Sequence, residues 1–234
     1  MKESLTIQVA DGSFNCYVAR PSAASAATAP VVVVVQEIFG VNAGIRSIAD
    51  NYAAKGYIAV APDLFWRTEP GLDMSESKEG DWAKGFALYN AFDFDKGVQD
   101  IAATVAAARS LQGASGKVGV TGYCLGGLMT FLTAARADAD AFVPYYGGGT
   151  DKYAQEALNI KRPMLYHLAG DDEYIGKDAQ AVINAALKDN PHAEVHTYPG
   201  RNHAFARPGG NHYDAQDATL ANGRTDAFFK KHLF

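Results

Sequence analysis

Short apolar runs alternate with longer, alanine-rich segments along most of the chain. Six runs rich in β-branched and aromatic residues predict strands: VVVVVQEIF (31–39), YIAVAPDLF (57–65), KVGVTGY (117–123), AFVPYYG (141–147), PMLYHLAG (163–170) and AEVHTYP (193–199). The segments between and after them predict helices, roughly over 43–55, 95–112, 126–137, 177–189 and 214–232. Strands that alternate with helices indicate an α/β fold, a mostly parallel sheet with helices on both faces.

The first residues follow a different pattern. LTIQVA (5–10) and SFNCYVA (13–19) alternate in polarity around Asp11-Gly12, which is a hairpin turn signal. This predicts an N-terminal antiparallel hairpin at one edge of the sheet. PSAASAATAP (21–30) is built of small residues between prolines and predicts a surface loop.

Residues 66–94 interrupt the alternation of strands and helices. They are polar, contain glycine and carry scattered aromatic side chains. The segment predicts either a covering segment or lid, with a short helix near 81–91, or a plain solvated insertion. Because no repeat and no linker is visible, residues 1–234 are expected to form a single domain.

Composition narrows the possible partners. The chain has 234 residues, a net charge of −5 and a pI near 5.6, so neither nucleic acid nor a membrane is expected as a partner. The N-terminus lacks the apolar core of a signal peptide, and Gln36 and Glu37 end the most apolar run far short of a membrane span. We therefore expect a cytoplasmic protein. With no surplus apolar helix, a monomer is expected.

The most informative stretch is VGVTGYCLGGLMTF, residues 118–131, in which a strand candidate runs into a helix candidate. Gly122-Tyr123-Cys124-Leu125-Gly126 is G-x-C-x-G, the pattern of a nucleophile elbow with cysteine in the place of serine. The turn is so tight that the positions two before and two after the nucleophile must be nearly without side chains. The helix N-terminus then favours a thiolate at Cys124, and the N–H of Leu125 becomes an oxyanion donor.

Hydrolases with a nucleophile elbow carry the nucleophile, the acid and the histidine in that chain order. Two more groups in this sequence complete such a triad. LAGDDEY follows a strand and offers Asp171, Asp172 and Glu173 as the carboxylate that orients a histidine. His203 lies in the loop after the next strand, where the base belongs. The other histidines are weaker candidates. His167 and His196 lie in strand candidates, whereas a turn, a polar loop and the C-terminal end hold His192, His212 and His232.

Other chemistry has weaker support. No H-E-x-x-H motif or cysteine pair indicates a metal, and no cofactor is expected. The second cysteine, Cys16, is expected to be a buried hydrophobe. Gln36-Glu37-Ile38-Phe39-Gly40 closes the first parallel strand, and the loop there supplies a second oxyanion N–H, here that of Ile38. Glu37 either faces the site or is a surface charge at a strand end.

Four segments together resemble the dienelactone hydrolase (carboxymethylenebutenolidase) family: QEIFG, GYCLGG, LAGDDEY and NHAFAR, with APDLF and NAFD between them. The similarity runs from about residue 5 to the C-terminus. It implies an α/β-hydrolase fold and a Cys-His-Asp triad, in which Cys124 is the nucleophile, His203 the base and Asp172 the acid, with Asp171 as runner-up. It also implies that Glu37 interacts with the thiol and helps to form the thiolate.

The family substrate is a lactone that carries a carboxylate, so the resemblance implies arginines that hold this anion. Arg207 in HAFAR matches one of them, and Tyr146 is a further candidate for substrate binding. Trp82 stands where the second arginine is expected, and Phe86 where a tyrosine is expected. Substitutes for that cation could be Lys78, Lys84 or Arg67.

These residues predict an enzyme that opens a small lactone or cleaves a small ester through a thioester intermediate. A carboxylesterase or thioesterase with the same machinery is the alternative, which the Trp82 departure favours. A non-catalytic binding or redox-sensing protein on the same fold is a third possibility, because a thiol at a helix start can oxidise reversibly.

Overall fold

The computed structural model describes residues 3–22 and 28–234, so residues 23–27 of the predicted loop 21–30 lie outside the described residues. The chain forms two compact units, residues 1–120 and residues 121–234. Strand β5 (Ala114–Tyr123) runs through the division between them. That residues 1–234 act as one domain stays a prediction.

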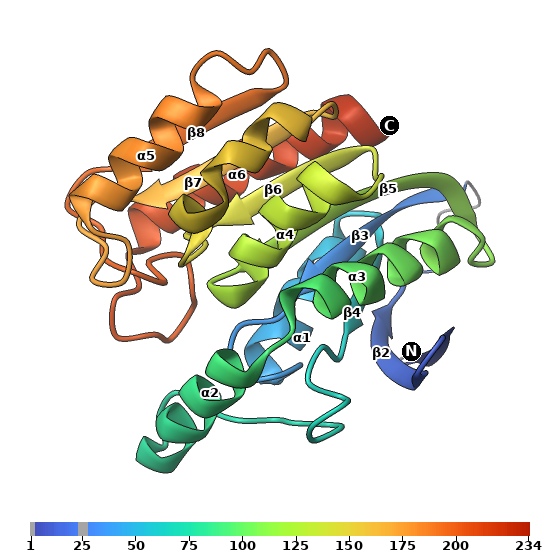
Figure 1. The fold of residues 1–234 in the computed structure, drawn as a ribbon. Coiled ribbons are helices and arrows are strands. Elements are labelled where there is room, and N and C mark those ends of the chain that lie inside the picture. The colour runs from blue at the N-terminus through green and yellow to red at the C-terminus, as the bar shows by residue number, and fades with distance from the viewer. Residues whose placement is uncertain (1–2, 23–27) are drawn as a thin grey trace. The chain divides into compact units, whose positions relative to one another are not determined.

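The first unit contains the predicted hairpin and the first parallel pair (Figure 1). Its strands lie in the order β1-β2-β4-β3-β5 and comprise β1 (Glu3–Val9), β2 (Gly12–Ala19), β3 (Ala29–Val35) and β4 (Ile58–Pro62). Strand β1 pairs antiparallel to β2, with Val9 opposite Gly12, and β3 runs parallel to β4. Every residue of β3 and β4 is buried, which explains why both read as continuous apolar runs.

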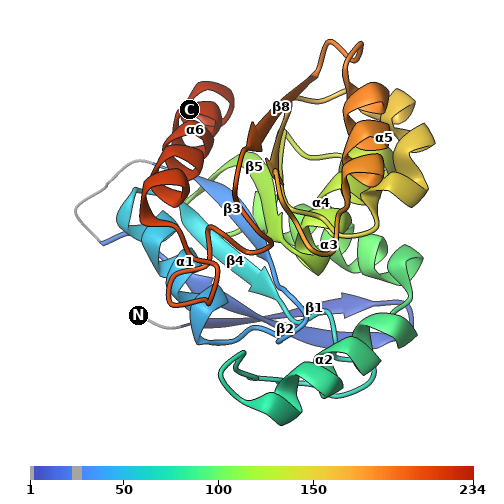
Figure 2. The same ribbon diagram turned by 90° about the vertical axis from the view of Figure 1, so that its left-hand side faces the viewer.

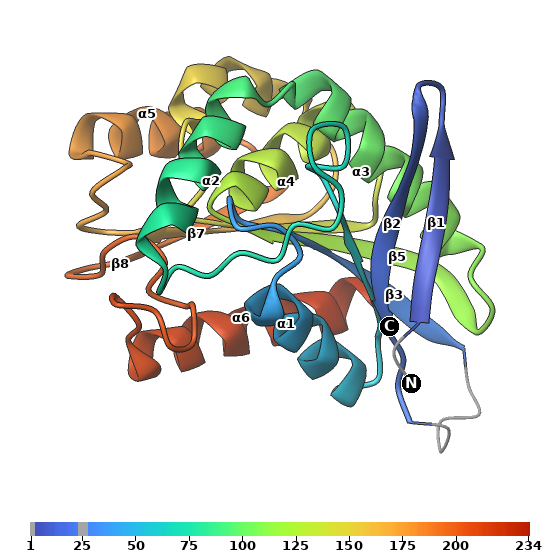
Figure 3. The same cartoon turned by 90° about the horizontal axis from the view of Figure 1, so that it is seen from below.

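Helices lie on both faces of the strands in the first unit. Helix α1 (Ala43–Ala54) contacts β2, β3 and β4, and α3 (Phe94–Arg109) contacts β1, β3 and β4 from the opposite side (Figure 3). Both helices begin with a side-chain cap, since Asn42 accepts from the Ile45 N–H and Asp93 from the Lys96 N–H. Helix α2 (Glu79–Ala91) confirms the short helix predicted inside residues 66–94.

A buried ionic cluster fixes the start of that segment. The Asp100 side chain on α3 is fully buried and accepts hydrogen bonds from Arg67 at 2.6 Å and from the Trp66 indole at 3.0 Å. Arg67 also pairs with Asp11 in the hairpin turn at 2.8 Å. The guanidinium therefore ties α3, the hairpin and the segment after β4 together.

In the second unit the strands lie in the order β5-β6-β7-β8, and β6, β7 and β8 run parallel to one another. Its elements are β6 (Ala141–Tyr145), β7 (Met164–Ala169), β8 (Ala193–Tyr198), α4 (Leu125–Arg136), the 3₁₀ helix η1 (Thr150–Asn159), α5 (Lys177–Leu187) and α6 (Ala215–Leu233). Helix α6 packs on β6 and β7, while α4 contacts β6 and α5 contacts β8. Figure 2 shows β8 between α5 and α6.

The predicted α/β class is confirmed: a mostly parallel sheet, an N-terminal antiparallel hairpin and helices on both faces in each unit. Helix η1 has no counterpart among the predicted elements, because only Thr150, Ala154 and Ala157 of its ten residues are buried. Among the described residues, no helix combines the length and apolarity needed to cross a membrane.

The ionic cluster generates a stability prediction. Replacing Arg67 by methionine leaves the buried Asp100 carboxylate without its cation, so we expect the free energy of unfolding to fall by about 3 kcal/mol. Lys96→Met is the matched control, because Lys96 reaches only the exposed Asp11, at 3.1 Å. Urea denaturation should show a much smaller change for Lys96→Met, and equal losses would contradict the assigned role of Asp100.

Candidate active site

Cys124 occupies the turn between β5 and α4 in a backbone conformation that few residues adopt. Its φ is 55° and its ψ is −115°, and it forms the N-cap of α4. The Cys124 N–H donates to the Tyr145 carbonyl at 3.2 Å, and its own carbonyl accepts from the Gly127 and Leu128 N–H groups. These bonds hold a strained residue, half-exposed, at the end of the strand, as the elbow pattern predicts.

The glycines around Cys124 are required by backbone contacts. A Cβ at Gly122 would lie 2.2 Å from the Gly126 carbonyl oxygen, which is closer than any side chain can come. A Cβ at Gly127 would lie 2.2 Å from the Tyr145 carbonyl oxygen, and one at Gly147 would lie 2.5 Å from the Leu128 nitrogen. The sequence pattern indicated Gly122 and Gly126 but missed Gly127 and Gly147, whose only signals are the glycine runs 126–127 and 147–149.

Leu125 is the first residue of α4 and is fully buried. The first N–H groups of a helix have no acceptor within the helix and carry the positive end of its dipole. The Leu125 N–H, next to Cys124, is therefore suited to stabilise a negative oxygen.

His203 and Asp172 form a buried pair. The loop after β8 carries His203, and the turn after β7 carries Asp172; the two side chains are 5% and 0% exposed. The His203 Nδ1 lies 2.9 and 3.0 Å from the two oxygens of Asp172. The N–H groups of Tyr174 and Ile175 also donate to Asp172 and fix its orientation.

The neighbouring acid, Asp171, has a different partner. It is exposed and pairs with Lys177 at 2.6 Å, which lowers the pKa of its carboxyl. The structure thus places Asp172, and not Asp171, against the histidine.

The charge on His203 depends on Cys124. Burial acts to lower the pKa of His203, but the Cys124 thiolate and the Asp172 carboxylate outweigh it and raise the pKa to about 10. The Nε2 atom makes no hydrogen bond of standard geometry with a described residue. The raised pKa of His203 favours the protonated imidazolium at neutral pH, next to the Asp172 carboxylate.

Aromatic rings pack against His203. The ring centroid of Tyr146, a predicted substrate-binding residue, lies 5.2 Å from that of His203, and the centroid of Tyr174 lies 4.9 Å from it. Tyr146 is fully buried with a φ of 36°, whereas Tyr174 is 47% exposed. Tyr174 was not among the predicted site residues, although an aromatic residue directly after the acidic turn is the signal that could have found it.

The remaining histidines have other partners. His167 is buried in β7, with Nδ1 2.9 Å from the Tyr198 hydroxyl and Nε2 3.0 Å from the Thr225 hydroxyl. Burial lowers its pKa well below the usual value, so the ring stays neutral. His196 pairs with Glu194 on β8. Neither is placed to replace His203.

Arg207 lies in the same turn as His203. Its N–H donates to the Ala204 carbonyl at 2.9 Å, and its Nε atom is buried. Ala204 has a φ of 62°, so the turn from 203 to 207 is sharp. It places a guanidinium on the loop that carries the histidine.

Glu37 and Ile38 belong to the first unit, where they follow β3 and are both buried. The Gln36 side chain fixes this loop, because its Oε1 accepts from the Leu64 N–H at 3.0 Å and its Nε2 donates to the Glu37 carbonyl at 3.3 Å. At Gly40, with a φ of 78°, a Cβ would lie 2.3 Å from the Leu72 carbonyl oxygen.

Trp82 and Phe86 form an aromatic cluster in the first unit. The Trp82 ring meets Phe39 edge-on at 5.0 Å and lies 5.9 Å from Phe86, and its indole donates to the Glu76 carbonyl. Two of the cations considered as substitutes are engaged, since Arg67 binds two carboxylates and Lys84 pairs with Glu69. The Trp82 ring therefore packs against two other aromatic rings.

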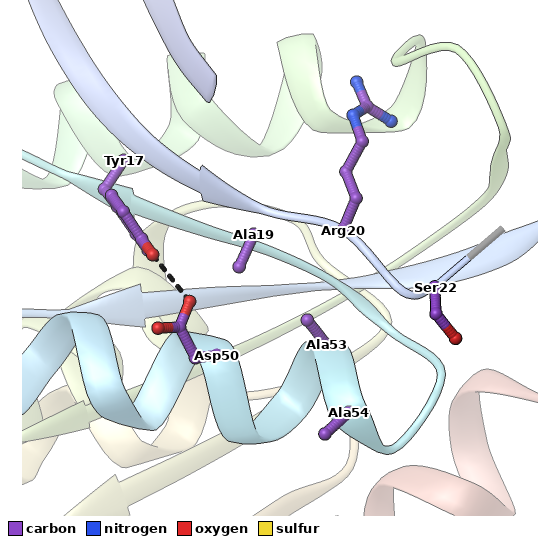
Figure 4. A pocket seen from close by; sticks show the side chains of 7 residues that line it. All are labelled: Tyr17, Ala19, Arg20, Ser22, Asp50, Ala53 and Ala54. Carbon is purple, nitrogen blue, oxygen red and sulfur yellow. Dashed lines mark hydrogen bonds between the residues drawn. The ribbon is translucent and has the colours of Figure 1, made fainter. Parts of the chain in front are cut away.

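A cavity of about 520 Å³ in the first unit contains none of the predicted site residues. Figure 4 shows Tyr17 and Asp50 pointing toward one another in it, with the Tyr17 hydroxyl donating to Asp50 at 2.6 Å. The remaining lining near α1 is mostly alanine. Nothing in this lining resembles catalytic machinery.

Comparison with known proteins identifies relatives over nearly the whole chain. Residues 14–233 match the model of the dienelactone hydrolase family. A carboxymethylenebutenolidase of Pseudomonas putida is 39% identical, covering 96% of this chain and 94% of its own. A protein of Azospirillum brasilense, provisionally given the same name, is 45% identical over 95% of both chains.

A solved structure from Klebsiella pneumoniae, provisionally named a dienelactone hydrolase, superposes with a TM-score of 0.85 at 27% identity and covers 98% of both chains. The predicted α/β-hydrolase fold is thereby confirmed.

The elbow glycine generates a mutational prediction. Gly122→Ala places a methyl group against the Gly126 carbonyl, so we expect a destabilised protein in which esterase activity falls at least tenfold, because a misplaced nucleophile costs about 10²-fold. Gly148→Ala is the control, since a Cβ at Gly148 meets nothing within 4 Å. Activity and melting temperature of the two variants, measured side by side, test this, and full activity in Gly122→Ala would contradict it.

The charge on His203 generates a second prediction. Because the Cys124 thiolate is the largest contribution that raises the pKa of His203, Cys124→Ala should lower that pKa from about 10. A ¹³C-edited NMR titration of the imidazole between pH 5 and 11 measures it. Cys16→Ala should leave the titration unchanged, whereas an unchanged pKa in Cys124→Ala would show that the thiolate does not act on the ring.

Proposed function

Because the chain belongs to the dienelactone hydrolase family and is a hydrolase of carboxylic ester bonds, we propose that it opens a small enol-lactone ring of the dienelactone type through a Cys-His-Asp triad. The observation that carries this proposal is the buried Asp172–His203 pair, whose imidazole charge responds to the Cys124 thiolate. No other described histidine combines an acid partner with the elbow cysteine.

The first step is nucleophilic attack. The Cys124 thiolate forms a bond to the lactone carbonyl carbon, and the carbonyl π electrons move to the oxygen. The N–H groups of Leu125 and Ile38 are the proposed donors to this oxyanion, a contribution of about 3 kcal/mol for each donor. The strained φ of Cys124 supports this step, because it presents the sulfur next to the start of α4.

Collapse of the tetrahedral intermediate breaks the ring C–O bond and releases an enolate. The His203 imidazolium gives its proton to the leaving group, and a thioester on Cys124 remains. The neutral His203 then takes a proton from water, the resulting hydroxide attacks the thioester, and the thiolate is expelled. The net reaction adds one water, and the Asp172 carboxylate stabilises the imidazolium each time it forms.

Other residues have supporting roles in the proposal. By the family resemblance, Glu37 assists formation of the thiolate. The Arg207 guanidinium, on the loop that carries His203, is suited to hold a substrate carboxylate. Tyr146 packs against the imidazole and limits its rotation, and it is a proposed substrate contact.

One observation favours a second candidate, a carboxylesterase or thioesterase that acts on another small activated ester. Trp82 stands at the position where the resemblance implies an anion-binding arginine, and its ring packs with Phe39 and Phe86. An aromatic surface suits a less anionic substrate. The hydrolase assignment leaves no support for the non-catalytic alternative considered from the sequence.

The test is the rate of dienelactone ring opening, followed by ultraviolet absorbance, before and after alkylation with iodoacetamide. We expect turnover that alkylation abolishes and that Cys124→Ala lacks. An enolate leaves far more readily than an alkoxide, so the enol lactone should react much faster than an ethyl ester.

Three results would change the assignment. Undiminished turnover in Cys124→Ala would exclude the thiol mechanism. A neutral activated ester that is cleaved in a Cys124-dependent way, with no lactone turnover, would establish the second candidate. Comparable rates for the enol lactone and the ethyl ester would contradict the proposed leaving-group chemistry.

A further inference from the structure

Asn202, directly before His203, joins the two loops that carry the proposed acid and base. Its side-chain oxygen accepts from the His203 N–H at 2.6 Å and from the Glu173 N–H at 2.9 Å. Glu173 directly follows Asp172 in the turn after β7, whereas Asn202 and His203 lie in the loop after β8. One amide oxygen thus binds the backbone next to each member of the pair.

The orientation of the Asn202 amide follows from its partners. Both backbone groups are donors, so the oxygen faces them and the amide nitrogen points to the His212 Nε2, 3.4 Å away. The His212 Nδ1 lies 3.1 Å from the His203 carbonyl, which can only accept. His212 therefore carries its proton on Nδ1, and its Nε2 is free to accept from Asn202.

The backbone bonds between the two loops end just before the reacting pair. Gly170 donates to Tyr198 and Asp171 donates to Arg201, each at 2.8 Å. Beyond these bonds, the loops are linked by the Asn202 side chain, by the longer contact of His212 with Glu173 at 3.6 Å, and by the Asp172–His203 bond itself. Of these links, only Asn202 binds the backbone next to both Asp172 and His203 at hydrogen-bond distance.

We propose that Asn202 is a positioning residue of the active site, which sets the distance and angle between Asp172 and His203 by binding the backbone of both loops. This inference rests on the proposed roles of Asp172 and His203. Tyr146 and Tyr174 restrain the imidazole ring by packing against it, and Asn202 fixes the backbone from which the ring extends.

The experiment compares four variants with the wild-type protein. Asn202→Ala removes the shared acceptor, and Asn202→Asp keeps an oxygen of the same reach. His212→Ala removes the contacts of His212 with the His203 carbonyl and with Glu173 but keeps both bonds to the Asn202 oxygen. Asn190→Ala is the matched control, because Asn190 is also half-buried and also binds backbone groups, those of Ala157, Ile160 and His192, at the opposite end of β8.

Four quantities are measured for each variant: kcat and KM for an activated ester, the pH at which alkylation of Cys124 by iodoacetamide is half-maximal, and the melting temperature. In Asn202→Ala we expect kcat to fall by about tenfold or more with KM little changed, since misplacing a catalytic group by 1 Å costs about 10²-fold. The alkylation midpoint should move to higher pH, because a displaced imidazolium stabilises the thiolate less.

The other variants separate positioning from stability. Asn202→Asp should recover most of kcat, and His212→Ala should lose much less kcat than Asn202→Ala, because it keeps both bonds to the Asn202 oxygen. Asn190→Ala should lower the melting temperature but leave the alkylation midpoint in place.

The inference is overturned if Asn202→Ala keeps the wild-type kcat and alkylation midpoint, or if Asn190→Ala shifts that midpoint equally. Should Asn202→Ala fail to fold, Asn202→Gln decides, because its oxygen is displaced by one methylene and it should lose kcat while Asn202→Asp does not. Failure of the proposed function is recognised separately, as wild-type turnover that survives alkylation of Cys124.

Discussion

The close approach of the first turn of α4 to the ends of β5 and β6 is the constraint on which the candidate site depends. No Cβ fits at Gly122, Gly127 or Gly147, since each would meet backbone atoms at 2.2 to 2.5 Å. This proximity holds Cys124 in a strained conformation with a positive φ and places its sulfur beside the helix N-terminus. The same contact seats the Tyr145–Gly147 turn, from which Tyr146 reaches His203. Weaker packing between α4 and the two strands would therefore disturb both the position of the Cys124 sulfur and the ring contact between Tyr146 and His203.

Much of the fold follows from local patterns in the sequence. The buried strands β3 and β4 read as continuous apolar runs, and Asp11-Gly12 marks the hairpin that the structure contains. The elbow is also visible locally, because the glycine at position −2, the cysteine and the strand-to-helix change all lie within ten residues. Helix η1 is not visible, since it buries few side chains.

The parts of the site that local patterns leave open depend on contacts between distant segments. The chemistry of the residues does not separate Asp171 from Asp172, and Asp172 is preferred in the sequence only through the family resemblance. In the structure the loop after β8 brings His203 to Asp172, and Lys177 pairs with Asp171. Gly147 is needed because α4 packs on it, although it lies outside the elbow motif. The Asn202 oxygen accepts from His203, its neighbour in sequence, and from Glu173, which lies 29 residues away. The sequence alone does not indicate the contact with Glu173.

The two cysteines differ in burial, so covalent labelling of thiols distinguishes folded from misfolded chains. Cys16 is 1% exposed, and burial raises the pKa of its thiol to about 12. At neutral pH its thiolate fraction is on the order of 10⁻⁵, so a soft electrophile has a single reactive sulfur to find. A folded chain is then expected to take up one covalent label, whereas a chain in which Cys16 has become exposed takes up two. A label count above one thus identifies misfolded material before any turnover number is assigned.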